Sequence, residues 1–178
     1  MTQFKKINNE VFYTQNTITQ INQEDISFLK DNIKYADKKR IRLCTHRNEK
    51  EKLQEMFIAL SRETYIRPHK HLNKAESLHV LEGDAEVVFF DENGKITKII
   101  SLSKSLSKSY FYYRINEPTY HTFIVKSDIF IFHETTHGPF NKSDTLYAPW
   151  SPEEKDFKKI DKFVLELKES AKTFAGSL

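Results

Sequence analysis

The sequence predicts a mainly β fold, a sandwich or a barrel, with helices before and after it. From about Tyr65 onward, short runs rich in Val, Ile, Phe and Tyr alternate with turn signals, a pattern typical of these folds. Residues 91–94 (DENG) lie between two such runs and predict a hairpin, and Gly83-Asp84 predicts a second turn. On both sides of this region the apolar residues change to helical spacing.

Three segments have the spacing of amphipathic helices. The first follows Asn22, a candidate N-cap, and the second begins at Asn48, with Glu51 three residues later as a capping-box partner. The third begins at residues 151–154 (SPEE), which combine an N-cap with proline at the first helical position. The apolar positions of the three are Ile26, Leu29 and Ile33; Leu53, Met56, Phe57 and Leu60; and Phe157, Ile160, Phe163, Val164 and Leu167.

We expect the 178 residues to form one domain, because no linker divides the chain. Residues 1–62 would contribute N-terminal strands and helices, residues 63–148 the barrel core, and residues 151–174 the C-terminal helix. The locally repetitive stretch 102–109 (LSKSLSKS) is interpreted as a solvated loop between strands.

Charge and composition favour a soluble protein without nucleic-acid partners. The 28 basic and 25 acidic residues leave a net charge of +3, and the lysines form no single block. Cys44 is the one cysteine, so no intrachain disulfide can form, and a reducing, cytoplasmic compartment is expected. The N-terminus has no apolar signal region, and no apolar run approaches the ~18 residues that would span a membrane.

A cluster of histidines and one glutamate predicts a metal site. His69 and His71 project to the same face of an extended strand, and a short turn would bring Glu76 back to them. Two imidazoles and a carboxylate suit one divalent ion such as Fe, Mn, Co, Ni or Zn. A further ligand is expected from another strand, and His121 is well placed to supply it. By contrast, alternation along the strand after Glu76 turns His79 to the opposite face.

These residues resemble those of a known family. The pattern His69-x-His71-x4-Glu76-x6-Gly83 resembles the first cupin motif, and residues 118–121 (PTYH) resemble a reduced second motif that lacks its usual glycine and asparagine. The flanking segments resemble the WbuC family of cupin-fold metalloproteins over about residues 24–157. They read TYIRPHKH, FDENGKI, GPF, YAPWSPEE and RIRLCTHRNEKEKLQEMFIAL, with Lys70 where that family often has arginine.

The resemblance implies a fold, a ligand set and a biological setting. The fold would be a single cupin barrel, also called a double-stranded β-helix or jelly roll, with flanking N-terminal and C-terminal helices. The metal would be held by His69, His71, Glu76 and His121. Such proteins are encoded among bacterial genes for O-antigen (lipopolysaccharide) or other surface polysaccharides.

Further polar residues are candidates for the ligand pocket. Arg42 and His46 would bind an anionic substrate if they reach the barrel mouth, and would otherwise be surface groups. Tyr65 and Arg67 precede the first ligand, and the resemblance makes Tyr120 a further candidate.

Two residues are candidates for chemistry beside the metal. Glu134 could act as a general base, or be a solvated charge at a strand end, and His46 is a second catalytic candidate. Catalysis by Cys44 is not favoured, since a free cysteine is often just a small buried residue.

These predictions support a metal-dependent enzyme acting on a sugar or sugar-nucleotide intermediate, by isomerisation, epimerisation or oxygenase chemistry. A metal-bearing binding or regulatory protein and a metal-independent epimerase are the alternatives. The N-terminal segment VFYTQNTITQI could add to a neighbour's sheet, so a homodimer is expected.

Overall fold

The computed structural model describes residues 3–104 and 109–176. Within these ranges it contains twelve strands, two α-helices and two short 3-10 helices. In chain order they are β1 (Phe4–Lys6), β2 (Val11–Thr14), α1 (Gln23–Asn32), η1 (Ile33–Tyr35), β3 (Arg40–Cys44), β4 (Leu53–Ser61), β5 (His69–His71), β6 (Glu76–Glu82), β7 (Asp84–Phe90), β8 (Ile96–Ser103), β9 (Tyr112–Ile115), β10 (Tyr120–Val125), β11 (Ile129–His137), η2 (Lys142–Asp144), β12 (Thr145–Tyr147) and α2 (Phe157–Gly176).

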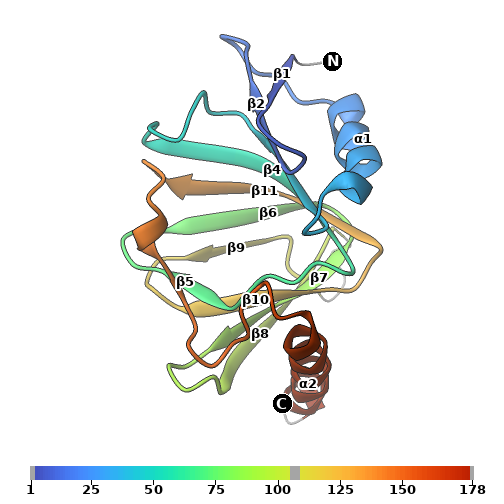
Figure 1. Cartoon of the computed structure of the whole chain (residues 1–178), viewed down its shortest axis with the longest axis vertical. Helices are drawn as coiled ribbons and strands as arrows, with labels where there is room; N and C mark the ends of the chain where they lie inside the picture. The colour runs from blue at the N-terminus through green and yellow to red at the C-terminus, as the bar shows by residue number, and fades with distance from the viewer. Residues whose placement is uncertain (1–2, 105–108, 177–178) are drawn as a thin grey trace.

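The strands form two sheets that face each other without closing into one continuous barrel. The larger sheet has the order β1-β2-β3-β4-β11-β6-β9, and the smaller has the order β12-β5-β10-β7-β8. All pairings between named strands are antiparallel except that of β2 with β3. Figure 1 shows α1 beside the N-terminal part of the larger sheet and α2 beside β8 of the smaller one. The predicted mainly β, cupin-like jelly-roll architecture with flanking helices is therefore confirmed.

Apolar side chains fill three layers. Between the sheets, an aromatic-rich cluster includes Phe89, Phe130 and Phe132. The other two layers lie on the outer faces, where α1 buries Leu29 against the larger sheet and α2 buries Leu167 against the smaller one. Because both outer faces are covered in part by helices, some strands bury both of their faces and read as continuous apolar runs.

The prediction of a helix beginning at Asn48 is wrong, because residues 53–61 form strand β4. Met56 faces the cavity between the sheets, while Phe57 and Ala59 pack under α1. A strand that is apolar on both faces can also satisfy helical spacing, and this explains the misleading pattern. β4 pairs with β3 and β11, so the larger sheet takes β1 to β4 from the region predicted to lie outside the barrel core.

The C-terminal helix begins later than predicted. It spans Phe157–Gly176 instead of residues 151–174, and Ser151 lies in the preceding irregular segment. The side chain of Asp156 accepts a hydrogen bond from the backbone N–H of Lys159 at 3.3 Å, as an N-cap residue does. Residues 148–156 therefore form an irregular connection with two turns instead of the start of a helix.

Other local predictions are confirmed. Asn22 caps α1 through a reciprocal capping box with Asp25, and strands form on both sides of the 91–94 hairpin. Gly83, between β6 and β7, has a φ of +79°, and an added Cβ would lie 2.2 Å from the carbonyl oxygen of Ile129, so only glycine fits. The predicted loop 102–109 lies partly outside the described residues, and β8 extends into it as far as Ser103.

Among the described residues, neither α-helix has the length and apolar character required to cross a membrane.

Candidate metal centre

Three strands bring the predicted metal ligands together between the sheets. His121 of β10 lies directly opposite His69 of β5 in the sheet register, and His71 follows two residues later on the same face. One ring nitrogen from each histidine lies within 4.8 Å of the others. Glu76 is the first residue of β6, in the facing sheet, and its side chain is buried.

Hydrogen bonds fix the orientation of all three imidazoles. Nδ1 of His69 donates to the carbonyl oxygen of Arg67, and Nδ1 of His121 donates to that of Thr119, each at 2.9 Å. Nδ1 of His71 lies 3.2 Å from the hydroxyl of Thr145. Since a carbonyl can only accept, the protons of His69 and His121 sit on Nδ1 and leave Nε2 as the ligand atom. Such outer hydrogen bonds are characteristic of metal-ligating histidines.

Glu76 completes the donor set. Its Oε1 lies 2.9 Å from Nε2 of His121, and its Oε2 lies 3.1 Å from Nε2 of His71. For an ion with metal–ligand bonds of about 2.1 Å, adjacent ligand atoms of an octahedron lie about 3.0 Å apart. The four donors therefore have the chemistry that a divalent ion requires, and the two distances from Glu76 match this spacing.

The electrostatics of the cluster favour a bound cation. Burial, together with the charges of His121 and His71, lowers the pKa of His69 to about 3, so this imidazole is neutral and ready to bind. Burial works to lower the pKa of His121, but the charge and hydrogen bond of Glu76 raise it overall. Burial works against ionisation of Glu76, yet the two histidines hold the pKa of its carboxyl well below the usual range. A negative charge thus persists beside the imidazoles, where a cation would be stabilised.

The cluster opens into a cavity of about 500 Å³ between the sheets. Glu134 of β11 lines this cavity, and so does Met56, which lies opposite it on β4. Burial and the nearby charge of Glu76 raise the pKa of Glu134 to about 7. Glu134 is half-buried in this cavity, and its pKa lies where a general acid or base works at neutral pH.

Arg42, His46 and Cys44 also line the cavity, on the same side of the sheet, as their alternation predicts. His46 is buried, its Nδ1 lies 3.0 Å from the carbonyl oxygen of Glu55, and burial lowers the pKa of its imidazole. Burial raises the pKa of the Cys44 thiol to about 11, so the reactive thiolate is disfavoured.

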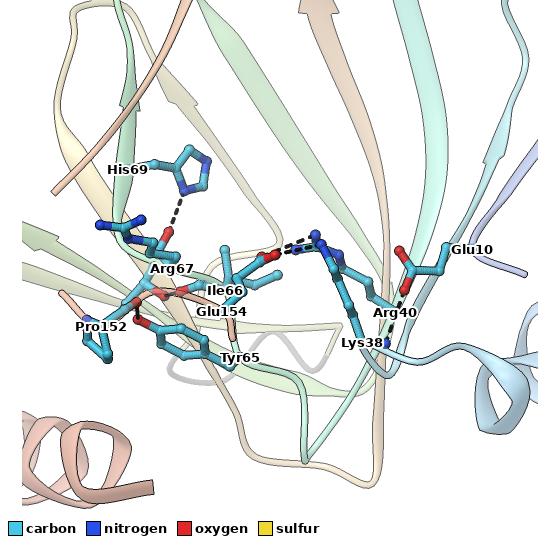
Figure 2. Close-up of polar contacts among 10 residues, drawn as sticks. Glu10, Lys38, Arg40, Tyr65, Ile66, Arg67, His69, Pro152 and Glu154 are labelled. Carbon is cyan, nitrogen blue, oxygen red and sulfur yellow. Dashed lines mark hydrogen bonds and ion pairs between the residues drawn. The ribbon is translucent and has the colours of Figure 1, made fainter. Parts of the chain in front are cut away.

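Three predicted ligand-binding residues contact the C-terminal segment. The hydroxyl of Tyr65 donates to the carbonyl oxygen of Pro152 at 3.0 Å (Figure 2), and Tyr65 is not among the cavity-lining residues of the described chain. Arg67 borders the cavity, but its Nε donates to the hydroxyl of Ser151 at 3.1 Å. Tyr120 is buried on the opposite face of β10 from His121, against Trp150.

His79 is exposed and lies opposite His133 on the outer face of the larger sheet, so the predicted outward orientation is confirmed. Thr145, which contacts His71, was not singled out from the sequence. It belongs to β12, whose pairing with β5 places Thr145 opposite His71. No local pattern in the sequence indicates this partnership.

Comparisons with known proteins support the fold. A family model described as a domain of unknown function, DUF6016, matches residues 21–102, which include His69, His71 and Glu76 but not His121. No curated protein has a sequence that matches this chain. Protein SO0799 from Shewanella oneidensis has a similar structure, with a TM-score of 0.51 and 10% identity over 60% of this chain and 72% of that one.

Two further solved structures are similar at lower TM-scores. Oxalate decarboxylase from Bacillus subtilis has a TM-score of 0.42 and 20% identity over 55% of this chain and 24% of that one. CapF, solved with the inhibitor 3-isopropenyl-tropolone, has a TM-score of 0.46 and 16% identity over 61% and 31%. This chain thus spans less than a third of either protein. Its own two sheets and histidine cluster define it as a mainly β protein with a jelly-roll-like fold and a candidate metal centre, while the resemblance to the WbuC family stays a prediction.

Proposed function

We propose that this protein is a metal-dependent enzyme that catalyses proton transfer next to a carbonyl group of a small, oxygen-rich molecule. The observation that carries the proposal is the orientation of the three imidazoles, whose Nδ1 atoms are held by hydrogen bonds while two of the Nε2 atoms contact Glu76. His69, His71, Glu76 and His121 would hold one divalent ion, which would supply Lewis-acid polarisation of a substrate oxygen.

Glu134 would move the proton. It lines the same cavity as the histidines, and its raised pKa allows it to accept and return a proton near neutral pH. This pairing of a candidate metal centre with a tuned carboxyl supports isomerisation or epimerisation, in which a carboxyl group takes up and returns the proton.

The proposed substrate class rests on the volume of the cavity and on the resemblance to WbuC proteins. A volume of about 500 Å³ is within the range of small-molecule sites. The resemblance to WbuC proteins supports a sugar or sugar-nucleotide intermediate of bacterial surface polysaccharide synthesis.

Chelation of purified protein is expected to abolish turnover of the active member of a panel of nucleotide sugars and sugar phosphates, and one equivalent of the native metal should restore it. Turnover would be followed by proton exchange with deuterated water, which detects abstraction next to a carbonyl directly. A His79→Ala variant is the matched control, because His79 lies outside the cavity, and it should behave as wild type. Full turnover in the presence of chelator would contradict the proposal and favour a metal-independent epimerase.

A further inference from the structure

Two arginines of β3 face the cavity from the larger sheet. Ile41 and Leu43 point to the outer face and pack under α1, so strand alternation turns Arg40 and Arg42 inward. Both arginines line the same cavity as the three histidines.

The hydrogen-bonding capacity of these arginines is largely unused. Arg40 forms an ion pair with Glu154 at 3.3 Å through one terminal nitrogen (Figure 2), while its buried Nε has no hydrogen-bond partner in the described chain. For Arg42, no hydrogen bond or ion pair joins its guanidinium to any described residue. A buried donor without a partner, such as Nε of Arg40, is costly, and an oxyanion ligand could accept charge-assisted hydrogen bonds from both guanidinium groups.

The two arginines lie well apart from the histidine cluster. In the register of the sheet, Arg42 is opposite Ile58 of β4, Ile58 is opposite Phe132 of β11, and Phe132 is opposite Val80 of β6, the strand that begins with Glu76. Three strand spacings correspond to about 14 Å between the β3 and β6 backbones. This separation places the two groups at different parts of the cavity, and a molecule the size of a monosaccharide could contact both.

We propose that Arg40 and Arg42 bind the phosphate or carboxylate of a monosaccharide-sized ligand whose other end reaches the histidine cluster. This inference rests on the proposed function for the identity of the reacting end, but the anion subsite belongs to β3 and does not require a bound metal. Guanidinium groups suit the role because they offer paired donors to an oxyanion.

Glu154 acts as an internal competitor in this arrangement. Its carboxylate borders the cavity and is shared between Arg40 and Lys38, whose Nζ lies 2.5 Å away (Figure 2). Loss of its charge would free Arg40 for an external anion, so Glu154→Gln is expected to tighten anion binding several-fold.

Calorimetric titration of the full-length protein with glucose 6-phosphate, glucuronate and glucose tests the subsite. We expect at least one of the two anions to bind at least tenfold more tightly than neutral glucose, and the preferred anion identifies the group that is recognised. Arg42→Gln should weaken that binding at least tenfold, and Arg42→Lys should weaken it less. Arg114→Gln is the matched control, because Arg114 is exposed on β9 outside the cavity, and it should change nothing.

The same titration with chelator present separates this inference from the proposed function. Anion binding that survives chelation and still depends on Arg42 supports the subsite even if the metal proposal fails. The inference is overturned if wild-type protein binds neither anion, if glucose binds as tightly as the anions, or if Arg42→Gln and Arg42→Lys both bind like wild type. Should Arg42→Gln fail to fold, Arg42→Lys and Glu154→Gln still decide the question.

Discussion

Replacement of His121 by alanine is expected to weaken divalent-metal binding by more than about 100-fold, because loss of a direct ligand exceeds the 10- to 100-fold cost of losing an outer-sphere partner. Among the candidate ligands, replacement of His121 is expected to lower metal affinity most, for a structural reason. Its buried ring contacts Glu76, so its removal also deprives that carboxylate of its closest imidazole partner. Affinity would be measured by competition with a metal-sensitive dye at pH 7.

His79→Ala is again the control, since it removes an exposed imidazole from the same β-rich region without touching the cluster. If His121→Ala retains wild-type affinity, or if His79→Ala loses as much, the assignment of His121 as a ligand fails.

Replacement of Glu134 by glutamine is expected to lower the turnover of a responsive substrate by about 10²- to 10⁴-fold, the usual contribution of a positioned general acid or base. Metal affinity should stay within a few-fold of wild type, because Glu134 lies on β11 and is not one of the four candidate ligands. The wild-type rate should rise with pH as the carboxyl ionises, with a midpoint at or below the pKa of about 7, because a bound cation would favour the charged form. In the glutamine variant this rising limb should disappear.

The pH profile separates catalysis from structural support. A variant that lost rate only through distortion of the cavity would keep the wild-type pH dependence at a lower level. That outcome, or a rate unchanged by the substitution, would remove Glu134 from the proposed mechanism.

Much of the candidate site could be predicted from the sequence, because side chains alternate along strands and particular residues favour turns. The HxH spacing of His69 and His71, and the outward position of His79, follow from strand geometry alone. The turn at Gly83 was predicted from its glycine, and the positive φ of this residue explains why glycine is needed there. The inward orientation of Arg42 also follows from alternation, although its lack of a partner could be seen only in three dimensions.

The failures have specific physical causes. β4 is covered on both faces, so its apolar residues gave no clean period of two, and Asn48 and Glu51 offered a convincing but false helix start. Tyr120 immediately precedes His121 in a strand, and alternation alone would have turned it away from the cavity. Tyr65 contacts Pro152, more than eighty residues away in the chain, and no local pattern encodes such a pairing.

Elemental analysis of natively expressed protein, purified without chelators, tests the central claim most directly. The proposed metal centre predicts about one divalent transition-metal ion per chain in the wild type and almost none in a His69→Ala/His71→Ala double variant, with the His79→Ala control retaining its metal. A folded wild-type protein without stoichiometric metal, or a double variant with the same metal content as wild type, would contradict it.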